Sequence, residues 1–476
     1  MADLKIATRT GGEANLRERV VQRLRLGFQG ALLRSGDSSY ETHRRVWNGM
    51  IDRRPALIAR CQGAADVLAA VNLAREHDML VAVRGGGHSV AGHSTCDGGL
   101  VIDLSLMRRV RVDPAAGTVV VEGGATWGDV DRATQAFGLA TPGGVVSTTG
   151  VAGLTLGGGY GWLRRKHGLS CDNLLSAEVI TADGRLVTAD EIANPELLWG
   201  LKGGGGNFGV VTSFRFRLHP VGPELMYVAT MYPAEKAGAV LRAWRDVVSA
   251  SGDEITSDAS LWSVPAMPDF PAELHGRPIV LVEAVYAGAA GEGERALQPL
   301  RRLAEPLLDL SGPLPYVALN SALDAMFPAG RYRSYWKSLY MNDLGPEAID
   351  AIVSRGVERP SSRSLIPIRH LGGAIGRVGP GDTALGDRRP AYMLSIDSTW
   401  EAPADTEKNI AWTRSFWSAM ERFSTGAVYF NFPGLLEEGE VLLRRAFGAN
   451  YARLVALKNK YDPFNVFRLN QNIKPG

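Results

Sequence analysis

Glycine is concentrated in four clusters in the first half of the chain. Glycine lets the backbone adopt positive φ and lets a ligand approach main-chain N–H groups closely, and such groups can hold phosphate without a lysine. Four unrelated tight turns are the simpler explanation, but four clusters in one domain favour a large phosphorylated cofactor. The clusters occupy residues 85–87, 143–144, 157–161 and 203–206.

One cluster matches the G-x-G-x-x-G fingerprint of dinucleotide-binding domains, through Gly204, Gly206 and Gly209. That fingerprint requires a preceding strand and a following helix. Residues 210–218 instead alternate in period 2 and are rich in β-branched side chains, which predicts a strand. The match is therefore accidental.

Composition excludes several classes of protein. The 476 residues exceed the usual size of one domain, so we expect two. The 52 basic and 50 acidic side chains leave a formal charge of +2, which argues against nucleic-acid binding. Three cysteines cannot form a disulfide framework, and no apolar run resembles a signal peptide or approaches the ~20 residues of a membrane span. We expect a soluble cytoplasmic enzyme with a small-molecule substrate and no metal, nucleic-acid or membrane partner, and its oligomeric state stays open.

The first 220 residues predict a domain of short strands. A helix at 64–77 between strands at 55–58 and 80–83 forms a β-α-β opening that leads into the first glycine cluster. Asp183-Gly184 is a strong hairpin signal. His219-Pro220 ends the strand at 210–218, and glycine becomes rarer afterwards, so we place a domain boundary after residue 220.

Residues 221–430 show a different pattern. Helix-like stretches separate apolar strands, which is typical of an antiparallel sheet backed by helices and gives an α+β class. The expected helices cover 234–249, 291–305 and 405–423, and the clearest strands cover 279–286 and 392–396.

Four segments stand in a fixed order along the chain: RGGGHS at 84–89, TTGVAGLTLGGGYGWLRRKHGLSCDN at 148–173, GGGGNFGVVT at 203–212 and YDPFNVFRLNQNI at 461–473. Together they resemble the FAD-linked oxidases of the vanillyl-alcohol oxidase superfamily, most of all its berberine-bridge-enzyme-like branch. The resemblance implies a PCMH-type FAD-binding domain (1–220), an α+β substrate-binding domain with an antiparallel sheet (221–430), and a C-terminal segment (431–476) that returns to the FAD domain.

The resemblance also implies how the cofactor is attached. Family members link the flavin 8α-methyl group to the histidine at the position of His88, and a neutral imidazole is a competent nucleophile for that bond. His93 is expected to be structural. Many relatives add a second link through a cysteine where this chain has Val146, and Cys171 lies elsewhere, so a single covalent bond at His88 is expected.

The other cofactor contacts implied by the resemblance lie in the same glycine-rich segments, their flanks and the C-terminal tail. The full predicted set is Arg84, Gly85, Gly86, Gly87, His88, Ser89, Thr148, Thr149, Gly150, Gly153, Gly159, Tyr160, Gly161, Asp172, Asn173, Ile180, Asn470 and Asn472.

Two ionisable residues are candidates for proton transfer. Tyr160 matches a tyrosine that plant members place near the reacting part of the flavin, where it serves as a base if a cation lowers its pKa; packing against the ring is the alternative. The lysine or carboxylate of other relatives corresponds to Met393 and Ser395, which leaves Asp397 as the ionisable group on that face. A second tyrosine base corresponds to Phe432. Tyr160 and Asp397 are therefore the candidates, and the substrate chemistry of relatives cannot be transferred.

Thr149 bears on how oxygen reacts. Relatives place a small apolar residue there that controls oxygen access, and a threonine resembles the flavin-N5-oxide monooxygenases of secondary metabolism, because a hydroxyl near N5 can direct oxygen to that atom. A simple hydrogen bond to the cofactor backbone is the alternative explanation.

The leading hypothesis is an oxidase that passes a hydride from a small alcohol, amine or activated ring carbon to flavin N5, and reoxidises with O2 to H2O2. The alternatives are an N5-oxide monooxygenase and a flavin-retaining ligand-binding protein without turnover, which the missing bases suggest. The run RYRSYWKSLY is either a substrate wall or core packing, and its charges predict a pocket for a phenolate or carboxylate, or else a solvated helix face. Its aromatic members are Tyr332, Tyr335, Trp336 and Tyr340, and its basic members are Arg331, Arg333 and Lys337.

Overall fold

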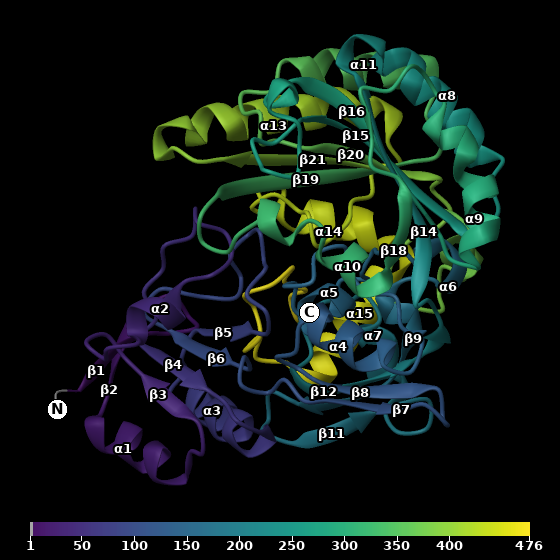
Figure 1. Ribbon diagram of the computed structural model, residues 1–476. Helices are drawn as coiled ribbons and strands as arrows, with labels where there is room; N and C mark the ends of the chain where they lie inside the picture. The colour runs from purple at the N-terminus through teal and green to yellow at the C-terminus, as the bar shows by residue number, and fades with distance from the viewer. Residues whose placement is uncertain (1–2) are drawn as a thin grey trace.

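The computed structural model describes residues 3–476 as two halves with a cavity between them (Figure 1). The N-terminal elements, purple to blue, form the lower half, and the teal and green elements form the upper half. The chain's last residues, in yellow, run back into the lower half. No helix in the described part of the chain is long and apolar enough to cross a bilayer.

The first sheet of the lower half contains the β-α-β opening. Its strands are β3 (Ala31–Leu33), β4 (Leu57–Arg60), β5 (Val81–Arg84) and β6 (Leu100–Asp103), flanked by β1 (Leu4–Ala7), β2 (Glu13–Leu16), α1 (Glu18–Gly27) and α2 (Tyr40–Arg44). The strand order is β3-β4-β6-β5, and β6 pairs in parallel with both β4 and β5. Parallel strands need a crossover, which α3 (Ala64–Glu76) supplies with Val67 and Val71 buried. The predicted opening is confirmed.

The second sheet of the lower half is antiparallel, in the order β11-β10-β12-β8-β7. Its strands are β7 (Val110–Asp113), β8 (Thr118–Glu122), β10 (Leu174–Ile180), β11 (Leu186–Ala189) and β12 (Val210–Arg217). The predicted hairpin joins β10 and β11, with Gly184 at φ +77°. A strand, β12, follows the G-x-G-x-x-G match, which confirms that the match is not a dinucleotide fingerprint.

The third sheet forms the upper half and is antiparallel throughout. Its strands are β14 (Glu224–Pro233), β15 (Ile255–Ser263), β16 (Pro278–Tyr286), β17 (Leu308–Asp309), β18 (Gly312–Pro315), β19 (Arg333–Met341), β20 (Ile366–His370) and β21 (Tyr392–Trp400). They run β17-β14-β16-β15-β20-β21-β19, and β18 also pairs with β14. This confirms the α+β class and the antiparallel sheet expected from the sequence.

Helices cover the outer face of this sheet, as Figure 1 shows. They are α8 (Ala237–Ser249), α9 (Ala290–Leu297), α11 (Pro346–Val357) and α13 (Thr406–Met420). The expected helix at 291–305 ends early because Pro299 cannot continue the hydrogen-bond ladder, and a 3₁₀ turn, Gln298–Arg301, follows. The opposite face of the sheet is left for the cavity.

The aromatic run at 331–340 is a strand and not the helix face that was one alternative. Most of it forms β19, which pairs with β21 along its whole length. Successive side chains of a strand point to opposite faces, so the charges of the run do not gather in one place. Arg331 is exposed and pairs with Glu401, whereas Lys337 is buried and pairs with Glu438.

The remaining helices lie close to the junction of the halves or in the lower half. They are α4 (Trp127–Gln135), α5 (Val151–Leu156), α6 (Arg164–His167), α7 (Pro195–Leu201), α10 (Tyr316–Ser321), α12 (Ala374–Arg377), α14 (Gly439–Phe447) and α15 (Tyr451–Tyr461). A two-stranded ladder of β9 (Leu139–Ala140) and β13 (His219–Pro220) closes the lower half just before β14 begins the upper sheet.

The C-terminal segment is held to the lower half by a buried lysine. Lys458 on α15 is fully buried and donates to Asp462 Oδ2 at 2.7 Å, to the Asn207 carbonyl at 2.9 Å and to the Phe467 carbonyl at 2.9 Å. Three acceptors satisfy the three N–H donors of the ammonium group. The residues that follow are thereby fixed beside the fourth glycine cluster, where Asn470 Nδ2 donates to the Gly206 carbonyl at 2.9 Å.

Candidate active site

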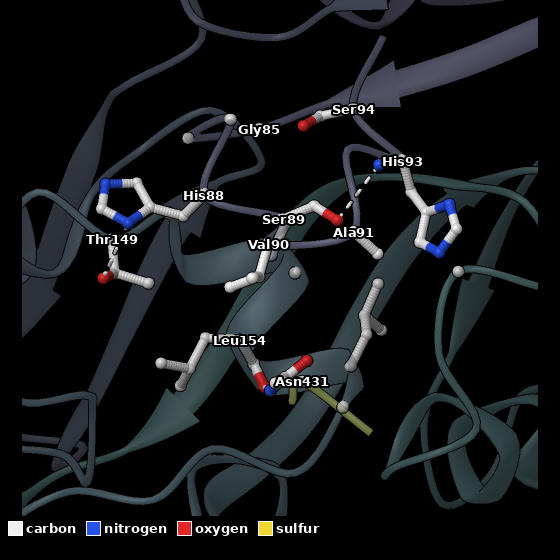
Figure 2. Close-up of a pocket in the computed structure, with 18 of the residues that line it drawn as sticks. Gly85, His88, Ser89, Val90, Ala91, His93, Ser94, Thr149, Leu154 and Asn431 are labelled. Atoms are coloured by element: carbon white, nitrogen blue, oxygen red, sulfur yellow. Dashed lines mark hydrogen bonds between the residues drawn. The ribbon is translucent and has the colours of Figure 1, made fainter. Parts of the chain in front are cut away.

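The cavity between the halves is lined by residues from Trp47 to Gln471, and each of the four glycine clusters contributes to its wall. The loop after β5 carries residues 85–94 along one side (Figure 2). His88 and His93 lie on opposite sides of this view, and Leu154 and Asn431 lie across from the loop. Clusters far apart in sequence therefore build one site, as the glycine pattern predicts.

Two glycines let the loop after β5 touch the segment before α5. A Cβ on Gly86 would collide with the backbone of Gly150, and a Cβ on Gly150 would collide with the backbone of Gly86. Gly153 differs, because a Cβ there would meet nothing within 4 Å although the residue lines the cavity. Gly86 and Gly150 let two segments of the cavity wall pack in direct backbone contact, and Gly153 leaves room for a ligand.

His88 is held between hydroxyls and an indole. Its Nε2 lies 3.1 Å from Thr148 Oγ1, and its Nδ1 lies 3.4 Å from Thr149 Oγ1. The ring stacks on Trp47, with centroids 5.3 Å apart and planes inclined by 21°. Burial lowers the pKa of His88 to about 4, so the imidazole is neutral near pH 7 and keeps a nucleophilic lone pair.

The upper sheet presents a carboxylate to the cavity. Asp397 on β21 and Trp336 on β19 are directly opposite in the strand register, and both line the cavity. The Ser395 hydroxyl donates to Asp397 Oδ1, and Arg369 Nη2 lies 3.9 Å from Asp397 Oδ2. Burial raises the pKa of Asp397 to about 6, and Arg369 partly offsets this effect. Asp397 is therefore mostly ionised at pH 7 but readily protonated.

Tyr160 also lines the cavity, but its surroundings do not favour a base. Its hydroxyl lies 2.9 Å from the Tyr340 hydroxyl, and its ring contacts Tyr429 edge to face at 4.7 Å. Burial raises the pKa of Tyr160 to about 12. The phenol therefore stays protonated near neutrality, where it can donate a hydrogen bond or pack but not accept a proton.

The predicted cofactor residues fall into two groups. Ten of them line the cavity: Gly85, Gly86, Gly87, His88, Ser89, Thr149, Gly150, Gly153, Tyr160 and Asn470. The other eight do not: Arg84, Thr148, Gly159, Gly161, Asp172, Asn173, Ile180 and Asn472.

Several residues of the second group have protein partners instead. Arg84 Nη2 donates to Asp103 at 2.8 Å, and Asp172 pairs with Arg388 at 2.7 Å. Asn173 accepts from His219 Nε2 at 2.7 Å, and Ile180 is fully buried in the core of the first sheet. These four side chains support the loops of the site from behind.

Sequence reasoning missed part of the cavity wall. Trp47 and Phe327 lie outside all four recognised segments, and Asn431 and Gln471 were not singled out as site residues. The Trp47 indole donates from Nε1 to the Phe327 carbonyl at 3.0 Å. The pair joins chain segments 280 residues apart, so no local pattern could have found it.

The wall has buried polar atoms that need a polar ligand. Oδ1 of Asn470 and both ring nitrogens of His93 are buried with no hydrogen-bond partner among the described residues, and both residues line the cavity. Such atoms cost free energy unless a ligand or water satisfies them. The ribityl hydroxyls and diphosphate of FAD supply suitable groups, and the space at Gly153 and the neutral His88 agree with that cofactor.

Comparisons with known proteins point to the same cofactor. Family models for an FAD binding domain and for berberine and berberine like proteins match residues 55–190 and 428–474. An FAD-linked oxidoreductase of Dictyostelium discoideum is 31% identical over 452 residues, covering 94% of this chain and 95% of that protein. (R)-6-hydroxynicotine oxidase of Paenarthrobacter nicotinovorans is 30% identical over 469 residues, covering 94% and 98%.

Solved structures of similar proteins superpose on nearly the whole chain. 6-Hydroxy-D-nicotine oxidase from Arthrobacter nicotinovorans superposes with a TM-score of 0.84 at 28% identity, covering 95% of this chain and 99% of that one. The BBE-like 1 protein of Physcomitrella patens gives 0.86 at 25% identity, covering 96% and 99%. The fold and the cavity thus define an FAD-dependent oxidoreductase. Within that class, the chain belongs to the berberine-bridge-enzyme-like family of FAD-linked oxidoreductases.

Proposed function

We propose that the protein is an oxidase with FAD bound covalently through His88 alone, and that it oxidises a small alcohol, amine or activated ring carbon with production of H2O2. FAD, when bound, accepts a hydride and passes the electrons to O2. The observation that carries the proposal is one cavity shared by a neutral histidine on the lower wall and a carboxylate, Asp397, on the upper sheet.

The proposal of a single covalent bond to the flavin rests on which nucleophilic side chains line the cavity. His88 and His93 both line the cavity, and burial lowers the pKa of each imidazole to about 4, so both are neutral near pH 7. The resemblance assigns the bond to His88, and Val146, which also lines the cavity, has no nucleophile. Cys171 is fully buried outside the cavity lining, and burial raises the pKa of its thiol, so it holds little thiolate. These residue types and their burial favour one covalent bond to the flavin over two.

Proton transfer is assigned to Asp397. A carboxylate with a pKa of about 6 is mostly ionised at pH 7 and has a basicity close to that of the solution, which suits a general base. Tyr160 keeps its proton and is better placed to orient a substrate through its hydroxyl. Ser395 and Arg369 position the Asp397 carboxylate.

Thr149 supports the oxidase over the N5-oxide monooxygenase. Its hydroxyl already has a partner, because Oγ1 lies 3.4 Å from His88 Nδ1. A hydroxyl that serves the attachment histidine needs no further role in directing oxygen. Asp397 likewise argues against a ligand-binding protein without turnover, since a buried carboxylate with a raised pKa in a cavity is typical of a catalytic group.

The test is a pair of measurements on purified protein. We expect yellow protein that keeps its flavin through acid precipitation, with one flavin-bearing peptide, containing His88, in a tryptic digest. Flavin reduced by dithionite should consume O2 and release H2O2 in near-equal amounts. Release of all FAD by acid, or O2 consumption without H2O2, would contradict the proposal.

A further inference from the structure

One loop of the upper half reaches two sides of the cavity histidine His88. Residues 323–330, which we call the clamp loop, connect α10 to β19. Near its start, a carboxylate binds the segment that contacts the imidazole nitrogens. Near its end, two backbone groups bind the tryptophan that stacks on the imidazole face. The two halves of the molecule therefore meet at the proposed point of attachment.

Asp324 of the clamp loop holds a turn of the lower half. Its Oδ1 accepts from the backbone N–H of Ser147 at 2.9 Å, and its Oδ2 accepts from the Ser147 hydroxyl. Hydrogen bonds to a carboxylate are stronger than those between neutral groups. On the other side, the Gly128 N–H of α4 donates to the Ser147 carbonyl at 2.8 Å, and a Cβ on Gly128 would lie 3.1 Å from Ser147 Oγ. Ser147 is thus held from both halves.

The two residues after Ser147 contact His88. Thr148 Oγ1 lies 3.1 Å from Nε2 of the imidazole, and Thr149 Oγ1 lies 3.4 Å from Nδ1, a contact drawn in Figure 2. The N–H of Trp127 donates to the Thr149 carbonyl at 3.0 Å. Threonine side chains are stiff about χ1, so a fixed backbone restricts both hydroxyls. A constraint on Ser147 therefore constrains the imidazole.

The end of the clamp loop holds the face of the same imidazole. The Phe327 carbonyl accepts from Trp47 Nε1 at 3.0 Å, and the Gly330 N–H donates to the Trp47 carbonyl at 2.8 Å. The Trp47 indole stacks on the His88 ring with planes inclined by 21°. The clamp loop therefore restrains both nitrogens of His88 through Ser147 and one face of its ring through Trp47.

His93 has no comparable support. It lines the same cavity, and burial lowers its pKa to about 4, as it does for His88. Neither ring nitrogen of His93 has a hydrogen-bond partner among the described residues. A nucleophile reacts fast when its lone pair is held towards the atom that it attacks. Charge therefore does not distinguish the two histidines, whereas orientation does.

We propose that the clamp loop orients His88 for its covalent bond to FAD, with Asp324 as the positioning residue. This inference rests on the proposed function, which supplies the bond at His88. In that step an imidazole nitrogen bonds to the 8α carbon, and the imidazole and the 8α-methyl group each lose one hydrogen. The flavin takes up these two hydrogens with their electrons, and O2 then receives them to become H2O2. Asp324 lies outside the cavity lining, so it acts through Ser147 and not by contact with FAD.

The first experiment measures the rate of attachment. Apoprotein from riboflavin-starved cells is mixed with FAD in air, and the flavin that stays with the protein after acid precipitation is followed over time. We expect Asp324→Ala to slow attachment about tenfold or more, because a small misplacement of a reacting group is costly. Asp324→Asn keeps an acceptor for the Ser147 N–H and should recover most of the rate. Fragment-ion spectra of the flavin peptide should place the bond on His88 and not on His93.

The second experiment measures binding without attachment. In a His88→Ala background no bond can form at this position, so the dissociation constant of FAD can be determined directly. Adding Asp324→Ala to this background should change that constant by less than about threefold. A weakening of FAD binding as large as the loss of attachment rate would make Asp324 a general structural residue and would overturn the inference.

Two further variants keep the test independent of folding defects in Asp324→Ala. Ser147→Ala removes the hydroxyl contact alone and should slow attachment by a smaller factor. The double variant should be no slower than Asp324→Ala, because both changes break one interaction. Asp37→Ala is the matched control, since Asp37 is half-buried, accepts the Arg34 N–H at 2.8 Å and lies outside the cavity lining. It should attach FAD at the parent rate.

The outcomes separate the two proposals. Parent-like rates in both Asp324→Ala and Ser147→Ala, or an equal loss in Asp37→Ala, would overturn the clamp loop and leave the covalent bond intact. A parent protein that never attaches FAD would overturn both the proposed function and this inference.

Discussion

The indole of Trp47 is stacked on the imidazole of His88, 5.3 Å between ring centroids. The backbone N–H of Trp47 donates to the Gly87 carbonyl at 3.1 Å, and its Nε1 donates to the Phe327 carbonyl at 3.0 Å. The next residue, Asn48, donates to carbonyls of both Val90 and Ser334. An N-terminal segment thus ties the loop of His88 to the upper sheet, so the orientation of His88 and the placement of β19 depend on each other.

His88→Ala should abolish covalent attachment. We expect protein that purifies with FAD but releases it on acid precipitation, because the remaining wall still contacts the cofactor. Absorbance of the supernatant and peptide mass spectrometry measure the effect. Cys171→Ser is the control and should keep the flavin bound, since Cys171 lies outside the cavity lining. Loss of attachment in that control would contradict a single link.

Asp397→Asn should slow anaerobic flavin reduction by about 10²–10⁴-fold, the usual loss for a general base. In the parent enzyme the rate should rise with pH through about 6 and level off above it, because the base acts in its ionised form. Rapid-mixing absorbance measurements with a reducing donor give both results. A rate that falls as the pH rises through 6 would refute the assignment.

Tyr160→Phe is expected to have a much smaller effect than Asp397→Asn. Tyr160 is protonated throughout the working range, and removal of its hydroxyl costs the contact with Tyr340 and no proton acceptor. We expect a rate loss below about tenfold at saturating donor. A loss as large as that of Asp397→Asn would return the base to Tyr160.

Thr149→Val separates the oxidase from the monooxygenase. The resting enzyme should show the spectrum of ordinary oxidised flavin, and the variant should keep most of its oxidase activity, because the hydroxyl contacts His88. Spectra of freshly purified protein before and after one turnover provide the measurement. An N5-oxide spectrum that disappears in Thr149→Val would make the monooxygenase the better description.

Asp131→Asn should stabilise the protein at alkaline pH. Asp131 on α4 is buried and accepts from Asn320 Nδ2 at 2.9 Å, and burial raises its pKa from 3.8 to about 7. The folded state therefore holds a proton that the unfolded chain releases, and this stabilisation is lost as the pH rises from about 4 to 7. The melting temperature of Asp131→Asn should exceed that of the parent at pH 8 and match it near pH 4. An exposed control, Asp269→Asn, should show no such divergence.

Local signals predicted the lower half of the fold well. Asp183-Gly184 and His219-Pro220 fix the backbone through conformations that depend on a few neighbouring residues, and the structure places a hairpin and a strand end there. The strand β19 was harder to predict, because whether its alternating rings face a cavity or a core depends on β21, more than 50 residues away.

The functional site was likewise predicted only where local sequence signals determine the structure. A motif gives the position of a residue in sequence but not the direction of its side chain, so Arg84 and Asp172 bind Asp103 and Arg388 instead of lining the cavity. The value of Asp397 as a base depends on burial and on Arg369, and the weakness of Tyr160 as a base depends on burial. The spacing of residues in the sequence reveals neither effect.

The return of the C-terminal segment has a consequence for biosynthesis. The cavity takes wall residues from Trp47 near one end of the chain to Gln471 near the other, and Lys458 holds the last of them in place. A nascent chain on the ribosome therefore lacks one wall of the cavity until residues 458–471 have emerged and folded. Any truncation before residue 458 should leave a colourless polypeptide.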